Sequence, residues 1–150
     1  MLRHLRLGIP FLLATACTGD PFSPAEERAL VAAEERWQAA GPASYTFEYL
    51  VSCFCEPHGW LRIAVEDGAV ATVVYADSAH VALDADGWPT VEDLFARVRE
   101  LAEGGSAHGR DVDAEFDATL GYPTSIDVTY DRSVQDGGVS YSVRNFTPVP

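Results

Sequence analysis

Residues 45–55 read Tyr-Thr-Phe-Glu-Tyr-Leu-Val-Ser-Cys-Phe-Cys, and they contain the clearest structural pattern in the chain. The odd-numbered positions carry aromatic, branched or thiol side chains, whereas most even-numbered positions are polar. A period of two places alternate residues on opposite faces of a β-strand. The segment therefore predicts a strand with one buried face, and Cys53 and Cys55 both belong to that face.

A helix is predicted immediately before this strand, over residues 24–40. Ser23 precedes Pro24, and Glu26 follows Ser23 by three positions, which is the pattern of a capping box with proline at the first helical position. Gly41 follows the last apolar position and ends the helix. The apolar residues lie three or four positions apart and would form one helical face: Leu30, Ala33, Trp37 and Ala40.

The strand is followed by a predicted hairpin. Residues 61–66 and 70–75 are rich in branched side chains, and the Asp67-Gly68 pair between them is a strong signal for a two-residue turn. Residues 76–89 are predicted to link this first half of the chain to the second.

The second half repeats the order of the first. Thr90 would cap a helix that ends at Gly104-Gly105, and its apolar face would comprise Val91, Leu94, Phe95, Val98, Leu101 and Ala102. Three alternating segments follow and predict strands: residues 111–118, 123–130 and 139–143.

The element order therefore predicts an α+β fold made of two α-βββ units. Short connections favour antiparallel neighbours, so we expect six strands in one antiparallel sheet with two helices packed on one face. The other face would be exposed to water. The acidic side chains that alternate through residues 111–117 fit this exposed face.

The N-terminus predicts export. Residues 1–6 contain Arg3 and Arg6, and the apolar run that follows is too short to span a bilayer. Small residues then lead into Cys17, as in the lipobox of bacterial lipoproteins, although ordinary cleavage near Ala16 is an alternative. We expect a signal peptide over residues 1–16, a lipid-anchor tether over 17–23 with Cys17 as the lipid attachment site, and a single α+β domain over 24–150.

The charge of the chain excludes one class of partner. The full chain has a formal charge of −13, and the part from Cys17 onward keeps eight arginines against 23 acidic residues, a charge of −15. Such a surface repels the phosphates of nucleic acids and of anionic lipids. Membrane attachment would therefore depend on the acyl chains of an N-terminal lipid. We expect the protein on the outer side of the cytoplasmic membrane, or in the periplasm or outer membrane.

Cys53, Cys55 and His58 are the main candidates for chemistry. Thiols of exported proteins usually oxidise, but residues two apart on a regular strand have Cβ atoms too far apart for a disulfide. A Cys53–Cys55 disulfide therefore requires the backbone to bend, which Pro57 and Gly59 would allow. The alternatives are buried structural thiols, an easily reduced redox disulfide, or a zinc or copper site with His58 and a fourth ligand such as His80 or His108.

Other site patterns are weak. Asp84, Asp86 and Asp93 fit a calcium loop around Gly87, but Ala82 stands at the first ligand position, so a turn followed by a helix cap is the preferred interpretation. The chain has no nucleophile elbow, no zinc-protease motif and no phosphate-binding loop. The sequence therefore predicts a protein that is not an enzyme and has no cofactor.

Several short motifs occur in order between residues 30 and 147. They are Trp37, Tyr45-x-Phe47-x5-Cys53-Phe54-Cys55, Val65-x2-Gly68-x-Val70, Thr90-Val91-Glu92-Asp93-Leu94-Phe95 and Phe116-Asp117-x3-Gly121-Tyr122-Pro123-x2-Ile126. This set resembles a bacterial family of exported proteins, often lipoproteins, that is defined as a domain of unknown function. Phe116 stands where that family often has tyrosine.

The resemblance implies a location in the cell envelope and no particular activity. The predicted architecture is also similar to PepSY-type and β-lactamase-inhibitor-like modules, which bind or restrain other proteins. We therefore expect a non-enzymatic module that binds an envelope protein or a small ligand. The alternative is a thiol-redox or metal-binding protein centred on Cys53, Cys55 and His58.

The lipid anchor can be tested directly. Changing Cys17 to Ser should release the protein from bacterial membranes, because the residue that would carry the acyl chains is lost. Metabolic labelling with a radioactive fatty acid and fractionation of membranes measure this. An unlabelled wild-type protein found wholly outside the membrane fraction would contradict it.

Overall fold

Two helices and seven strands make up the described part of the chain. The structure is a computed structural model that describes residues 22–53, 59–105, 111–130 and 137–150. No helix within these ranges is long and apolar enough to cross a membrane. The elements are α1 (Pro24–Ala40), β1 (Tyr45–Cys53), β2 (Leu61–Glu66), β3 (Ala69–Tyr75), β4 (Ser78–Leu83), α2 (Val91–Gly105), β5 (Asp111–Phe116), β6 (Pro123–Thr129) and β7 (Gly138–Pro148).

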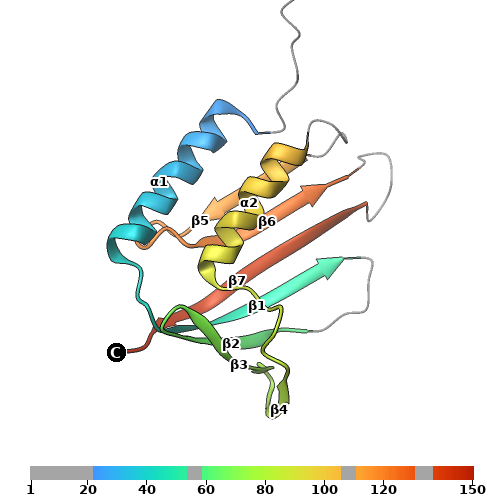
Figure 1. Cartoon of the computed structure of the whole chain (residues 1–150). Coiled ribbons are helices and arrows are strands. Elements are labelled where there is room, and N and C mark those ends of the chain that lie inside the picture. Colours follow the sequence, from blue (N-terminus) through green and yellow to red (C-terminus); the bar gives the residue numbers. More distant parts are fainter. Residues whose placement is uncertain (1–21, 54–58, 106–110, 131–136) are drawn as a thin grey trace, which may run out of the picture.

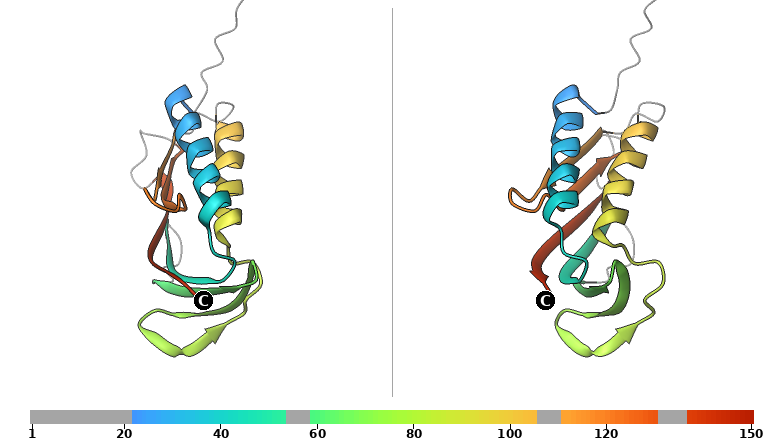
Figure 2. Two further views of the ribbon diagram at one scale, coloured as in Figure 1. Left: turned by 90° about the vertical axis from the view of Figure 1, so that its left-hand side faces the viewer. Right: turned by 60° about the vertical axis from the view of Figure 1, so that its left-hand side comes forward.

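All seven strands form one antiparallel sheet in the order β4-β3-β2-β1-β7-β6-β5. The predicted α+β class with an antiparallel sheet is confirmed. β1 lies at the centre, where it pairs with β2 of the first half and with β7 of the second. Figures 1 and 2 show both helices on the same face of the sheet, with β2, β3 and β4 curling below them.

The predicted number of strands was wrong, because the expected linker over residues 76–89 contains β4. Ser78 pairs with Tyr75 across a tight turn, and Leu83 pairs with Val73. The sequence of β4 mixes small, polar and apolar residues without a period of two. Its strand conformation therefore comes from pairing with β3, which occupies backbone groups that would otherwise need water.

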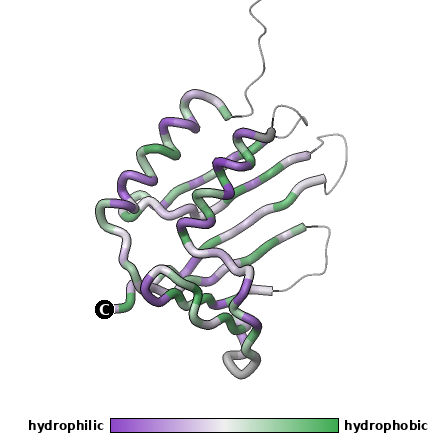
Figure 3. The backbone as a smooth tube through the Cα atoms, viewed as in Figure 1, coloured by the Kyte–Doolittle hydropathy of each residue, from purple (hydrophilic) through white to green (hydrophobic). Residues whose placement is uncertain are grey.

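The core lies between the helices and the sheet. Leu30, Ala33 and Trp37 of the predicted α1 face are buried, whereas Ala40 at the end of the helix is exposed. Figure 3 shows hydrophobic and hydrophilic residues alternating in short steps along both helices. The five side chains expected to pack on the sheet are all buried: Trp37, Val91, Leu94, Phe95 and Val98.

Local signals set the ends of α1. The capping box is present, since Ser23 Oγ accepts from the Glu26 N–H and the Glu26 carboxylate accepts from the Ser23 N–H. At the other end, a Cβ on Gly41 would lie 2.7 Å from the Trp37 ring, so the chain can pass over this ring only with glycine. Gly41 therefore lets the chain turn directly from α1 toward β1.

The turn between β5 and β6 packs against α1. The Asp117 side chain accepts backbone hydrogen bonds from Thr119 and Leu120, at 2.9 and 2.6 Å. Gly121 follows with φ of +88°, and a Cβ there would lie 2.2 Å from the Ala33 carbonyl oxygen. The Gly-Tyr-Pro motif is thus explained by packing: glycine allows both the left-handed backbone and the close approach to the helix.

Tyr45 joins β1 to both helices. Its hydroxyl accepts from the Val91 N–H at 2.9 Å, at the start of α2, and donates to Glu92 at 3.4 Å. The other Glu92 oxygen accepts from the Trp37 indole N–H at 2.8 Å. The Trp37 and Tyr45 rings also meet edge to face, with centroids 5.5 Å apart. One partly buried network therefore connects α1, α2 and the central strand.

Candidate ligand-binding cleft

The predicted cysteine site lies mostly outside the described residues. Cys17, Cys55 and His58 belong to the segments without a description. Cys53 ends β1 on the helix side of the sheet, half-buried opposite Val139, and it is disulfide-bonded. Its bonded partner is not among the described residues, so the Cys53–Cys55 pairing stays a prediction. A disulfide at Cys53 agrees with a structural role for this thiol.

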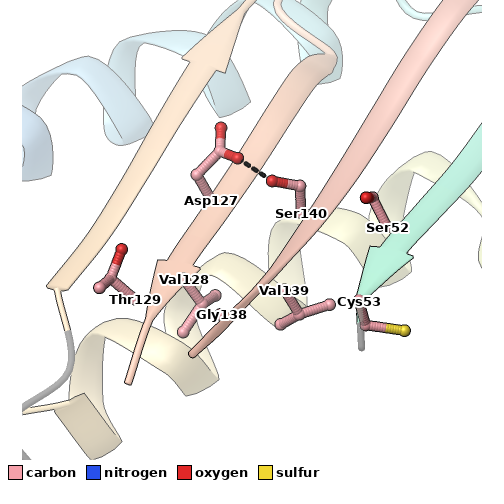
Figure 4. Close-up of a pocket in the computed structure, with 8 residues that line it drawn as sticks. All are labelled: Ser52, Cys53, Asp127, Val128, Thr129, Gly138, Val139 and Ser140. Carbon is pink, nitrogen blue, oxygen red and sulfur yellow. Dashed lines mark hydrogen bonds between the residues drawn. The ribbon is translucent and has the colours of Figure 1, made fainter. Parts of the chain in front are cut away.

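A shallow depression of about 300 Å³ lies beside Cys53, across the ends of β1, β6 and β7. Figure 4 shows the Ser140 hydroxyl bonded to Asp127, with the Cys53 sulfur directed away from this pair. Within the described parts of the chain no three histidine, cysteine or acidic side chains are grouped to hold a metal ion. The side chains of His80 and His108 lie outside what the structure describes, so a metal site with either of them stays a prediction.

The possible calcium loop is a turn and a cap. The Asp84 carboxylate accepts from the Asp86 N–H at 3.1 Å, which closes a local turn before Gly87. Asp93 is turned toward Thr90, whose N–H and hydroxyl donate to it at 2.9 and 2.8 Å. The preferred interpretation from the sequence, a turn followed by a helix cap, is confirmed.

Glu48 corrects the expectation that the second face of the sheet is simply exposed to water. Its side chain lies on that face but is only 7% exposed, because Arg62 of β2 and Arg144 of β7 flank it. Both guanidinium groups donate to its carboxylate, at 3.0 and 2.9 Å, and so does Asn145 at 2.9 Å. Trp60 covers Arg144, with the guanidinium carbon 3.7 Å from its ring centroid.

This network stabilises the join between the two halves of the sheet. Burial alone would raise the pKa of Glu48, but the hydrogen bonds from Arg62, Arg144 and Asn145 outweigh burial and hold the pKa below its usual value. The carboxylate is thus ionised and fully partnered. We assign it a structural role, because a satisfied ion network has no free group to offer a ligand.

A larger cleft of about 700 Å³ lies on the helix side of the sheet. It opens between α2, the segment that leads into α2, and the centre of the sheet. Tyr49 of β1 and Tyr141 of β7 form its floor, Leu94 and Arg97 of α2 line one wall, and Trp88 comes from the preceding segment. A cleft of this volume, lined by aromatic side chains and by the charged residues Asp93, Arg97 and Glu100, has the size of a small-molecule site.

The Tyr49 hydroxyl is the unusual group in this cleft. Tyr49 is only 5% exposed, yet no described residue forms a hydrogen bond with its hydroxyl. The hydroxyl itself is not fully buried, because among the described residues the only fully buried side-chain polar atom without a partner is Arg36 Nε. The hydroxyl is therefore reached from the cleft. Tyr45, on the same face of the same strand, is equally buried and has two partners. The contrast marks the Tyr49 hydroxyl as open to a bound molecule.

Tyr141 and Arg97 complete the polar part of the cleft. The Tyr49 and Tyr141 rings are nearly parallel, with centroids 6.4 Å apart. Burial raises the pKa of both phenols, and the nearby Arg97 guanidinium opposes this only in part. Both hydroxyls are therefore protonated at neutral pH, so they can donate hydrogen bonds.

Another groove, of about 640 Å³, lies between α1 and α2. Its polar groups are largely satisfied within the protein, since Arg99 donates to both carboxylate oxygens of Glu34 and Trp37 donates to Glu92. Among the described residues, this groove is lined by no buried tyrosine whose hydroxyl lacks a hydrogen-bond partner. We therefore regard the Tyr49–Arg97 cleft as the better candidate for a functional site.

Residues 29–148 match the model of one protein family, which is described as "Family of unknown function (DUF6174)". No curated protein and no solved structure matches the chain. The match extends from the first helix to the last strand, so it includes every residue of the cleft.

The Glu48 network predicts a pH-dependent contribution to stability. Glu48→Gln should lower the free energy of unfolding at pH 7 by about 1–3 kcal/mol, because charge-assisted hydrogen bonds are lost. The pKa of Glu48 is lower in the folded state than its usual value of 4.5. The extra stability of the wild-type protein should therefore be fully present above pH 4.5, and it should disappear as the pH falls through the pKa of the folded state.

Urea unfolding of both proteins between pH 3 and pH 7 measures this effect. The matched control is Glu115→Gln, an exposed carboxylate on the same face of the sheet, which should change stability by less than about 0.5 kcal/mol. A Glu48 variant as stable as wild type at pH 7 would show that the network contributes nothing.

Proposed function

The chain belongs to the DUF6174 family of unknown function, and we propose that it is a non-enzymatic binding module that holds a small organic molecule in the Tyr49–Arg97 cleft. The module would be exported, bacterial and anchored through a lipid on Cys17, on the outer side of the cytoplasmic membrane or in the periplasm or outer membrane. The lipid alone would attach the protein to a membrane.

The observation that carries this proposal is the Tyr49 hydroxyl. Tyr49 is a buried residue, but its hydroxyl reaches a cleft of about 700 Å³ and has no hydrogen-bond partner among the described residues. A bound molecule that accepts a hydrogen bond from this hydroxyl would take the place of water there. Leu94 and Trp88 would cover the apolar part of the same molecule.

Binding without catalysis fits the groups in the cleft. The residues that line it include no histidine, cysteine or serine. Its two tyrosines have raised pKa values, so neither phenol is a ready base at neutral pH. The remaining polar side chains can hold a ligand in place, but they form no nucleophile–base pair.

The proposed cellular location is based on the N-terminal sequence. Arg3 and Arg6, the apolar run and the small residues before Cys17 support export and lipidation. A tether of about seven residues would then separate the lipid from α1. The metal-binding alternative has less support, because a disulfide-bonded Cys53 offers no thiolate to a metal.

Tryptophan fluorescence can locate the bound molecule. The chain has three tryptophans, of which Trp88 lines the cleft and Trp60 lies on the other side of the sheet against Arg144. We expect some members of a library of small aromatic anions, neutral molecules and cations to raise the melting temperature, and these compounds should change the tryptophan emission.

The emission change should be lost in Trp88→Phe and kept in the matched control Trp60→Phe. If the change persists in Trp88→Phe and is lost in Trp60→Phe, the molecule binds on the other face of the sheet and the proposed site is wrong. If no compound of any class raises the melting temperature or changes the emission, the proposed function itself is wrong.

A further inference from the structure

We propose that the cleft selects a flat, mostly apolar molecule that carries a single carboxylate, and that this carboxylate binds to Tyr49, Tyr141 and Arg97. This assignment rests on the proposed function and names the class of ligand for the same site. It follows from the separation of polar groups between the inner end of the cleft and its rim.

The floor of the cleft offers two phenol O–H groups that can donate hydrogen bonds, and Arg97 lies in the wall beside them. The Tyr49 hydroxyl has no partner among the described residues, and no hydrogen bond to Tyr141 is formed within that part of the chain either. Their rings are nearly parallel, and both side chains line the same cleft. Arg97 lines this cleft too, and its guanidinium acts electrostatically on both phenols. Two O–H groups and a cation that border one cleft can bind a carboxylate.

Arg97 is available for such a ligand. Its present partner is Glu100, one helical turn away, at 2.9 Å. The Arg97 and Glu100 side chains are 47% and 70% exposed, and exposed ion pairs of this kind contribute little to stability. One guanidinium also presents five N–H donors, so it can bind Glu100 and a ligand at the same time.

The rim of the cleft limits the charge of the ligand. Asp93 and Glu100 lie at its exposed edge, and the whole chain carries a formal charge of −13. A polyanion would meet repulsion from both, whereas a single carboxylate could contact Arg97 in place of Glu100, whose exposed ion pair contributes little. An ammonium at the inner end would face Arg97 and two O–H groups, so we expect it to be disfavoured.

The body of the ligand would be flat and apolar. Trp88, Leu94 and Ala96 supply the surface beyond the donors, and the cavity of about 700 Å³ has room for a two-ring aromatic molecule. An aromatic body can also pack against the face or edge of Trp88.

A matched series of probes tests the class of ligand. 2-Naphthoate, 2-naphthamide and 2-naphthylmethylamine share one ring system and differ in the charge of a single substituent. We expect calorimetric titration of the full-length mature protein at pH 7 to give 2-naphthoate an affinity at least about tenfold above that of the amide, with the amine weakest.

Two variants connect the preference to the named residues. Arg97→Gln should weaken naphthoate about tenfold or more and leave naphthamide nearly unchanged, because only the charged contact is lost. Tyr49→Phe removes one oxygen and should weaken naphthoate about tenfold. The control is Tyr122→Phe, a partly buried tyrosine outside the cleft, which should bind as wild type does.

The outcomes separate this inference from the proposed function. Preference for naphthoate that depends on Arg97 and Tyr49 supports both. Equal or tighter binding of the amide or the amine overturns the carboxylate assignment. If the emission change caused by these probes is still lost in Trp88→Phe, the cleft remains the binding site. Absence of binding by all three probes at millimolar concentration overturns the carboxylate assignment, and the proposed function fails with it when the wider library also gives no binding compound.

Discussion

The hydrogen bonds of the Tyr45 hydroxyl are the contact on which the rest of the fold depends. Through them the central strand is attached to the first turn of α2, and Glu92 extends the attachment to Trp37 of α1. The sheet on its own leaves both helices free to slide, because apolar packing has no fixed direction. This network sets where α2 begins relative to β1. It also leaves space between α2 and the strands farther along.

Tyr49 lies in that space. It is two residues after Phe47 in β1, so its side chain is on the same face of the strand as Tyr45. The two tyrosines have the same chemistry and similar burial, but only Tyr45 has partners for its hydroxyl among the described residues. A fold that satisfies one phenol and leaves the other facing a cleft is consistent with a site for a ligand. On the opposite face, the Glu48 network connects β2, β1 and β7 beneath the floor of the cleft.

Local patterns were sufficient to predict much of the fold. The bounds of α1, its capping box and the Asp67-Gly68 turn depend on neighbours in sequence, and each was predicted correctly. β4 and the burial of Glu48 were not predicted, because both depend on pairing with other strands. The cleft was missed for the same reason: Tyr49, Arg97 and Tyr141 are far apart in sequence. The residues that carried the family resemblance mostly cap, turn or fill the core, so they describe the fold rather than the site.

A direct measurement observes the Tyr49 hydroxyl itself. In protein labelled with ¹³C at the ζ-carbon of tyrosine, each phenol gives one resonance that responds to hydrogen bonding at its oxygen, and Tyr49→Phe and Tyr45→Phe assign two of the six. Addition of 2-naphthoate should shift the Tyr49 resonance and leave that of Tyr45 in place, because only the Tyr49 oxygen is open to the cleft. Saturable binding that leaves the Tyr49 resonance unchanged would contradict the account.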